Sequence, residues 1–392
     1  MVGVLMALNA LSIDILLPAL GEIGAALGAP GNDRQLVITA YVFGFGLAQL
    51  GFGPLADALG RRRTLLYALA AYLGATVLCL LAPDMMWMII ARTLQGVAAA
   101  ATRVVAVAVV RDLVSGRRMA EIMSFAMTVF MIAPILAPGI GQMVLFVAPW
   151  QAIFGVLLVL GGGITVWMLT RLPETLSDHN RIPLSFAAAA RNYQLAASHR
   201  VTFGYMSAAA LIFGALFAFI ATSEQVLAEL YGLDEWFAVA FGGVAIGLAL
   251  ANILNARIVR RIGMRRISHT ALAAFLAVNL LHLVIAAFGQ PPFWVYLTLL
   301  TTALVMFAWM GANFSALVME PAGERAGTTA ALYGGVTSMS GAFLGSLIGA
   351  MYDGTVVPLI GGFVVMGAFA IAIVYWAERG QMFGEGEAAP AE

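Results

Sequence analysis

The sequence predicts an all-α integral membrane protein with twelve transmembrane helices arranged as two six-helix halves. Of its 392 residues, 62% are hydrophobic and only 10% are charged, whereas a soluble domain carries roughly 25% charged residues. Twelve apolar stretches are long enough to cross a bilayer, which takes about 20 residues per helix. A polar stretch separates the sixth apolar stretch from the seventh. These observations exclude a water-soluble fold.

The apolar stretches set the expected domain boundaries. We expect an N-terminal six-helix half at 1–170, a cytoplasmic linker at 171–200, a C-terminal half at 201–377 and a cytoplasmic tail at 378–392, whose acidic end is expected to be disordered. No basic residue precedes Arg34, so the first stretch is interpreted as a span and not as a cleaved signal. The expected spans are 2–24, 35–56, 64–82, 86–110, 120–147, 151–170, 201–223, 236–256, 267–288, 293–319, 327–351 and 357–377.

The positions of the arginines predict the topology, since the chain contains no lysine. If the amino terminus is cytoplasmic, the inner joints hold nearly all of the arginines that lie outside the spans, and the outer joints hold only Arg34. The positive-inside rule then places both termini in the cytoplasm. The two halves also resemble each other weakly, because Gly53 to Arg63 aligns with Ala256 to Arg266 at a shift of about 203 residues, which favours a duplicated six-span unit.

Four short motifs resemble those of a known family. Residues 53–65 contain every residue of the signature G-x-L-x-D-x-x-G-R-R-x-x-L of the major facilitator superfamily. Residues 92–96 resemble its R-x-x-Q-G signature, and residues 137–142 are similar to the antiporter motif G-P-x-x-G-G. Residues 12–20 resemble the first-span pattern S-x-D-x-Y-L-P-A-L of the bicyclomycin-resistance (Bcr/CflA) drug-proton antiporters.

This resemblance implies a major facilitator fold that works by alternating access and exports drug-like molecules in exchange for protons. Four features depart from the family pattern and concern the substrate more than the mechanism. Leu16 replaces a tyrosine and Gln142 a glycine, Ser223 to Val226 stand where the subfamily tends to have a proline, and Arg103 is an additional arginine in span four.

Ionisable groups inside the spans are candidates for proton and substrate binding, because each is costly unless it is paired or faces water. Asp14 lies midway along span one, bracketed in depth by Arg92 and Arg103, which are eleven residues apart and so return to nearly the same helix face. We expect Asp14 to bind substrate and proton alternately. The alternative is a permanent Asp14 to arginine ion pair that only fixes packing. Further candidates are Tyr41, Glu224 and Asn313, although a snorkelling role for Glu224 and an interhelical hydrogen bond for Asn313 remain open.

A second group of residues is predicted to gate the cytoplasmic side. Asp57 ends span two and Arg111 closes span four, so we expect an Asp57 to Arg111 bridge that stabilises the outward-facing state, with Arg61 and Arg62 beside it. Asp57 could instead cap the turn before Gly60. In span five, Pro138 and Gly141 remove a backbone hydrogen bond and permit close helix approach.

The sequence therefore favours a monomeric, proton-coupled efflux antiporter of the bacterial inner membrane, with the lipid bilayer as its surroundings, a small drug-like substrate, and the proton gradient in place of a cofactor. The net charge of zero gives no reason to expect nucleic acid. A dedicated metabolite exporter or an uptake symporter on the same fold is the nearest alternative. A membrane-embedded enzyme or a lipid-handling scaffold lacks support, because no metal-ligand, P-loop or nucleophile motif is present.

Overall fold

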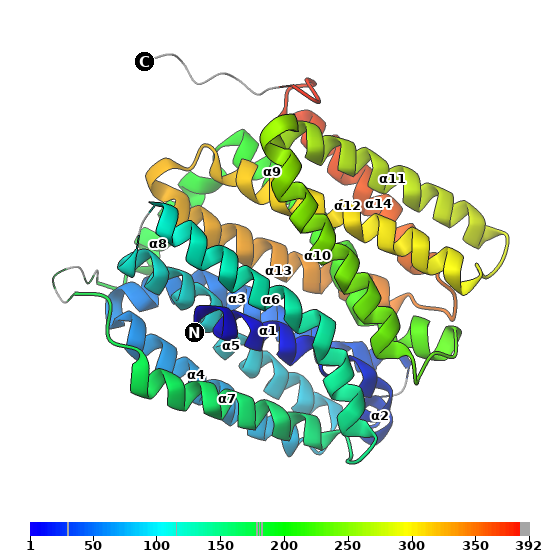
Figure 1. Cartoon of the computed structure of the whole chain (residues 1–392), viewed down its shortest axis with the longest axis horizontal. Helices are drawn as coiled ribbons and strands as arrows, with labels where there is room; N and C mark the ends of the chain where they lie inside the picture. The colour runs from blue at the N-terminus through cyan, green and yellow to red at the C-terminus, as the bar shows by residue number, and fades with distance from the viewer. Residues whose placement is uncertain (30, 115, 178, 180, 182, 385–392) are drawn as a thin grey trace. The chain divides into compact units, whose positions relative to one another are not determined.

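The computed structural model describes residues 1–29, 31–114, 116–177, 179, 181 and 183–384, and within these residues the secondary structure is entirely helical. Twelve segments of the described chain are long and apolar enough to span a membrane (Figure 1). The predicted fold class and number of spans are confirmed. The acidic end of the tail, 385–392, lies outside the described residues.

The first six spans are built as follows. They are α1 (Val2–Asp14) with η1 (Leu17–Ala19) and α2 (Leu20–Ala26), η2 (Gly31–Gln35) with α3 (Leu36–Leu59), α4 (Arg61–Leu80), α5 (Met85–Leu113), α6 (Gly116–Leu145) and α7 (Gln151–Arg171).

The linker contains a helix that the sequence analysis did not predict, α8 (Phe186–Ala197). The last six spans are α9 (Arg200–Glu224) with the π-helix η4 (Gln225–Leu230), α10 (Phe237–Ile262), α11 (Met264–Ala287), α12 (Phe293–Met319), α13 (Ala326–Ala350) preceded by η5 (Gly323–Arg325), and α14 (Val357–Ala377).

By its internal packing the chain divides into two units. Unit 1 comprises Met1–Ala190 and Leu233–Gly242, and unit 2 comprises Arg191–Gly232 and Gly243–Glu392. The first turns of α10 thus belong with unit 1. The boundaries expected at 170 and 201 remain predictions.

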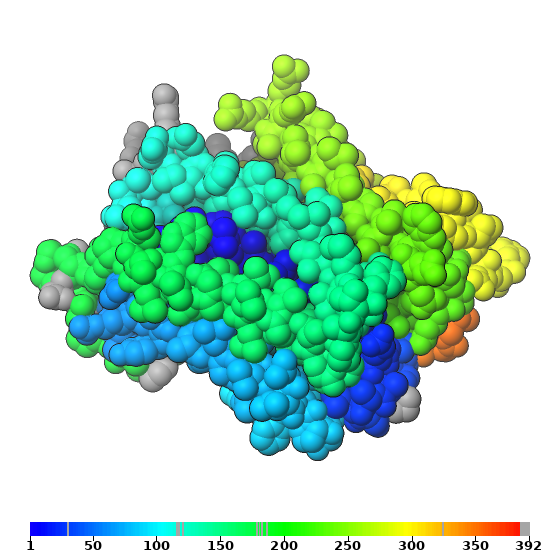
Figure 2. Space-filling model, turned by 60° about the horizontal axis from the view of Figure 1, so that its bottom comes forward, coloured from blue at the N-terminus to red at the C-terminus, as the bar shows by residue number. Residues whose placement is uncertain are grey.

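Within unit 1, close helix pairs determine where the polar side chains lie. A Cβ atom on Gly96 of α5 would overlap the carbonyl oxygen of Tyr41 in α3, and one on Gly44 would overlap that of Thr93, so the two helices cross at backbone contact. The helices α4 and α7 pack side by side (Figure 1). The dark blue α1 lies between α6 and α7 (Figure 2). As a result, α1, α3, α4 and α5 enclose one common interior.

Candidate functional site

The first span is interrupted directly after Asp14. Pro18 has no amide hydrogen, so the carbonyl oxygen of Asp14 loses its helical partner and α1 ends. The chain continues as a 3-10 turn before α2 begins, with the amide of Leu16 donating to the carbonyl of Ile13 over 3.4 Å. Asp14 is 5% exposed. Its carboxyl group therefore lies at a break in the span and away from bulk solvent.

Arg92 of α5 is wholly buried and bonds to neutral acceptors. Its Nε donates to the carbonyl oxygen of Val37 over 3.0 Å, its Nη2 to that of Ser12 over 3.1 Å, and its Nη1 to Oε1 of Gln95 over 2.5 Å. The guanidinium carbon lies 4.4 Å from the centre of the Tyr41 ring, a cation–π arrangement. Arg92 thereby fastens α1 and α3 to α5.

The network extends from Arg92 into α4 through side-chain hydrogen bonds. Gln95 donates from Nε2 to Oγ1 of Thr76 over 2.7 Å, and Thr76 donates to the carbonyl of Tyr72. The hydroxyls of Tyr72 and Ser12 lie 2.7 Å apart, and the Ser12 hydroxyl also donates to the carbonyl of Leu8. Because buried polar groups are costly when unpaired, a network of this kind fixes the relative positions of its helices.

Asp14 takes no part in this network. Over the part of the chain that the structure describes, its carboxyl group makes no hydrogen bond and no ion pair. Arg103 lies eleven residues beyond Arg92, about 16 Å along α5, and its side chain is exposed. The two arginines thus lie in different surroundings, and the alternative of a permanent Asp14 to arginine ion pair is not observed.

The backbone around Asp14 is held from two sides. On one side Arg92 binds the carbonyl of Ser12, two residues before Asp14. On the other, Gly141 of α6 packs so closely that a Cβ there would overlap the carbonyl oxygen of Ile15. Pro138, one turn earlier in α6, is buried as well. Two predicted residues from separate motifs therefore contact the residues that flank Asp14.

The remaining candidates for proton and substrate binding lie in different places. In unit 1, the Tyr41 hydroxyl donates to Oδ1 of Asn9 over 3.0 Å. In unit 2, Nδ2 of Asn313 donates to Oδ1 of Asn255 over 2.9 Å, an interhelical pair between α12 and α10. Glu224 is buried at the junction of α9 with the π-helix. That position is six residues before the end of the span Arg200–Leu230, so snorkelling from the span end is not what is observed.

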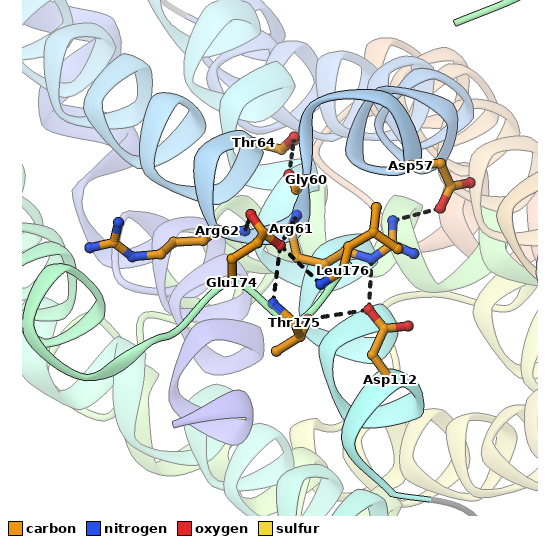
Figure 3. A network of polar contacts seen from close by, with 9 residues as sticks. All are labelled: Asp57, Gly60, Arg61, Arg62, Thr64, Asp112, Glu174, Thr175 and Leu176. Carbon is orange, nitrogen blue, oxygen red and sulfur yellow. Dashed lines mark hydrogen bonds and ion pairs between the residues drawn. The ribbon is translucent and has the colours of Figure 1, made fainter. Parts of the chain in front are cut away.

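A polar cluster joins the ends of several helices of unit 1 (Figure 3). Arg61 donates from Nη1 to Oδ1 of Asp57 over 2.6 Å and from Nε to Oδ2 of Asp112 over 3.0 Å. The Glu174 carboxylate accepts from the backbone amides of Arg61 and Arg62 over 2.8 and 3.2 Å, which caps the start of α4. We call these residues, Asp57, Arg61, Asp112 and Glu174, the Arg61 cluster.

The predicted bridge from Asp57 to Arg111 is absent from this structure, and its gating role stays a prediction. Asp57 pairs with Arg61, and the carboxylate of Asp112 completes the contact to α5, while the side chain of Arg111 is exposed. The reason is geometric: Arg61 follows Asp57 by four residues and turns back toward it, because Gly60 between them adopts a positive φ of 97°. Neighbouring residues on α5 point to different faces, so Asp112 and not Arg111 meets Arg61.

The sequence profile of the Major Facilitator Superfamily matches residues 2–346 of the chain. The chain belongs to the major facilitator superfamily. A bicyclomycin resistance protein homolog of Haemophilus influenzae is 32% identical over 378 residues, covering 95% of this chain and 93% of the relative.

Two further relatives are an uncharacterized MFS-type transporter of Bacillus subtilis and a multidrug resistance protein of Citrobacter koseri. The first is 30% identical over 369 residues, which is 92% of this chain and 90% of the relative. The second is 27% identical over 241 residues, 61% of this chain and 60% of the relative. The expected resemblance to the Bcr/CflA subfamily is confirmed.

Solved structures of this superfamily show the same fold. The human organic anion transporter MFSD10 matches with a TM-score of 0.68 at 18% identity, covering 95% of this chain and 97% of that one. The xylose transporter of E. coli matches with a TM-score of 0.70 at 14% identity, covering 96% and 94%. This superfamily member is accordingly a multi-pass membrane transporter and not an enzyme.

Three residues that contact the predicted ones were not predicted from the sequence, namely Gln95, Asp112 and Glu174. Gln95 and Asp112 stand inside or beside recognised motifs, but the motif alone assigned them no contact. Glu174 follows the sixth span in a polar linker, where nothing local signals that it caps α4 over one hundred residues earlier. Glu378 lies 204 residues further along, close to the shift of about 203 between the halves, and this spacing could have drawn attention to Glu174.

Proposed function

We propose that this transporter is a proton-coupled exporter of small drug-like molecules in the bacterial inner membrane. It works as a monomer by alternating access, with both termini cytoplasmic and with the proton gradient in place of any cofactor. Substrate and proton compete for the same carboxyl group, so that binding of one releases the other. The arginine-rich joints support the topology through the positive-inside rule.

The arrangement around Asp14 is the observation that carries the proposal. A carboxylate buried without a paired charge is costly, and it can be neutralised by binding a proton. Asp14 is buried at a break in its span, and no described residue bonds its carboxyl group. Arg92 and Gly141 hold the backbone on either side of it, so a movement of α5 or α6 reaches Asp14 directly.

Arg92 has a supporting role in the proposed cycle. Because its donors bond to neutral acceptors, the guanidinium keeps its charge unpaired by any carboxylate among the described residues. The hydrogen bond from Arg92 to the carbonyl of Ser12 fixes the backbone two residues before Asp14. We infer that Arg92 positions the segment that carries Asp14.

The substrate class is inferred from the relatives. One is named for bicyclomycin resistance and another for multidrug resistance. We expect a small, largely apolar or zwitterionic compound, because small-molecule sites are mostly apolar with few polar groups.

The test is efflux measured in energised inverted vesicles across a panel of amphenicols, sulfonamides, bicyclic peptides and lipophilic cations. The wild type is compared with Asp14→Asn and with Asp33→Asn. Asp33→Asn is the matched control, because it removes an exposed carboxylate in η2, after the end of α2. We expect gradient-driven transport in the wild type and in Asp33→Asn, and none above background in Asp14→Asn.

Proton movement is measured in the same preparations. Adding substrate to purified wild-type protein in weak buffer should release protons, and Asp14→Asn should release none. Gradient-driven export that persists in Asp14→Asn would overturn the assignment of the proton site. Substrate accumulation in the direction of the proton gradient would overturn antiport and favour a symporter.

A further inference from the structure

A groove of about 480 Å³ lies beside the Arg61 cluster and has no part in the proposed transport site. Its walls are the last turn of α7, the three residues that follow it and Arg62 of α4. In Figure 3 the side chain of Arg62 points away from Asp57 and Asp112. All of these residues belong to unit 1. The groove is therefore formed by the arginine-rich ends of two neighbouring membrane helices.

The charge that faces the groove is positive. Among the described residues, the guanidinium of Arg62 makes one hydrogen bond, from Nη2 to the carbonyl oxygen of Leu169, and the side chain of Arg171 makes none. The single acid of the lining, Glu174, is already engaged, since its oxygens accept from the backbone amides of Arg61, Arg62, Thr175 and Leu176. Two guanidinium groups thus retain donors for an anion, while the oxygens of the carboxylate are occupied by backbone amides.

The end of α7 by itself would repel an anion, because a helix carboxyl terminus carries partial negative charge. Arg62 offsets this effect, since its Nη2 covers the exposed carbonyl of Leu169 over 3.0 Å. Arg171 in the last turn of α7 adds a second positive charge at the same place. Both guanidinium groups offer the planar, forked donor pattern that binds phosphate oxygens in pairs.

The depth of the groove matches the headgroup layer of a membrane. Trp167 is exposed one turn before Arg171, and Tyr67 is exposed one turn after Arg63 on α4. Exposed Trp and Tyr side chains at span ends mark the boundary between lipid tails and headgroups. Leu169 in the groove wall is 49% exposed, and Val166 beside it is also open. An apolar surface thus continues from the groove toward the hydrocarbon region.

We propose that this groove binds the headgroup phosphate of an anionic phospholipid, with Arg62 and Arg171 on the phosphate and with the acyl chains along α7. A lipid accounts for both halves of the surface, the paired arginines and the apolar strip, whereas a free anion would use only the first. The bound lipid would hold the end of α7 against the start of α4, which is where Glu174 caps α4.

The proposal is tested on the intact, detergent-purified protein by native mass spectrometry with added phosphatidylglycerol or phosphatidylcholine. The variants are Arg171→Gln and the double variant Arg62→Gln with Arg171→Gln. The double variant Arg63→Gln with Arg191→Gln removes two exposed arginines that do not line the groove and is the control matched for charge. Arg171→Gln is informative even if loss of Arg62 harms folding, because Arg171 has no bond in the described structure.

We expect the wild type to retain phosphatidylglycerol in preference to phosphatidylcholine. Binding should weaken about five-fold in Arg171→Gln and further in the double variant, and it should be unchanged in the control. Equal phosphatidylglycerol binding in Arg171→Gln and wild type would overturn the proposal, as would an equal loss in the control.

Two further measurements identify the source of the phosphate. Inorganic phosphate at millimolar concentration should not displace the lipid, and a photoreactive phosphatidylglycerol should cross-link within 166–174. Displacement by inorganic phosphate would show a soluble anion site instead and overturn the commitment to lipid. Asp14→Asn should bind phosphatidylglycerol like the wild type, so that failure of the transport proposal and failure of this one are distinguishable.

Discussion

The two units carry arginine clusters at corresponding helix junctions, and the clusters hold different helices. In both, a glycine with positive φ, Gly60 at 97° and Gly263 at 89°, precedes a helix that begins with arginines. In unit 2, Arg265 donates to Glu320 over 2.8 Å and to Glu378 over 2.9 Å, and Tyr205 also donates to Glu378. We call these four residues the Arg265 cluster.

The difference lies in the helix that precedes each glycine. In unit 1, Asp57 of α3 pairs with Arg61, so the second span is tied to the fourth through one guanidinium. In unit 2, α10 has no acidic residue, and its last turns contain Arg257, Arg260 and Arg261. The Arg265 cluster therefore joins the ends of α9, α11, α12 and α14 and leaves α10 out. The two junctions share the glycine turn and differ in which helix the arginine holds.

The interiors of the units also differ, at the fourth span of unit 1 and the tenth span in unit 2. The α5 helix of unit 1 buries the guanidinium of Arg92, whereas its counterpart α12 in unit 2 meets α10 through the neutral pair Asn255 and Asn313. Unit 2 also buries ionisable side chains, at Glu224, His269 and His282, so the contrast concerns this pair of helices and not the whole interior.

The largest effect is expected from removing the buried guanidinium of unit 1. Arg92→Met removes three buried hydrogen bonds, to Ser12, Val37 and Gln95, and should lower the free energy of unfolding by about 3 kcal/mol or more. Asn313→Val in unit 2 breaks one interhelical hydrogen bond and should cost about 1 kcal/mol. Thermal unfolding in detergent compares the two, and equal losses would contradict the contrast between the interiors.

Proton release on substrate addition, measured in the same variants, distinguishes a role of Arg92 in positioning Asp14 from a role in stability alone. Arg92→Met should abolish proton release on substrate addition even at temperatures where the protein stays folded. Asn313→Val should retain proton release. If Arg92→Lys restores folding but not proton release, the forked donor geometry of arginine is required in addition to the charge.

A smaller effect is expected from breaking the clusters at the helix ends. Arg61→Gln should cost about 2 kcal/mol, because it leaves Asp112 largely buried without its partner, and the exposure of Asp57 reduces the loss. It should also increase the labelling of single cysteines placed at the ends of α3 and α5 in a Cys79→Ser background. Arg265→Gln should destabilise the protein to a similar degree without changing that labelling. Increased labelling in both variants would show that the clusters are equivalent.

The sequence predicted the spans and several residues of interest, but not the partners that their side chains contact. The spans follow from hydrophobic length, which is a local property, and the motifs identified Asp14, Arg92 and Arg61 as residues of interest. Partners could not be predicted, because they depend on helix rotation and on contacts between distant segments. The choice of Asp112 over Arg111 is a rotation of one residue, about 100°. Helix α8 was missed because its alanine-rich sequence lies in a stretch judged only by its polarity.

A loss of about 1 kcal/mol is expected when the cap of α4 is weakened. Glu174→Gln removes the charge that bonds the amides of Arg61 and Arg62, and helix caps are typically worth this amount. Glu378→Gln should instead weaken side-chain contacts to Arg265 and Tyr205, so its cost should fall when Arg265 is already removed. Double-variant unfolding measurements distinguish these outcomes. Arg61→Gln keeps the backbone amide that Glu174 binds. If the loss caused by Glu174→Gln vanishes in the Arg61→Gln background, Glu174 acts through the Arg61 side chain and not through its amide.

The smallest expected effect is a difference between two coupling energies, that of Arg61 with Asp112 and that of Arg61 with Asp57. It decides which of these contacts can act as a gate. Arg61 and Asp112 are 4% and 15% exposed at the side chain, whereas Asp57 is 38% exposed. Double-mutant cycles should therefore give a coupling energy near 1 kcal/mol for Arg61 with Asp112 and about 0.5 kcal/mol or less for Arg61 with Asp57. A gate must open in every transport cycle, so the weaker bond to α3 is the one suited to break while α4 and α5 stay joined. If the cycles give the reverse order, α5 and not α3 is the helix that separates from Arg61.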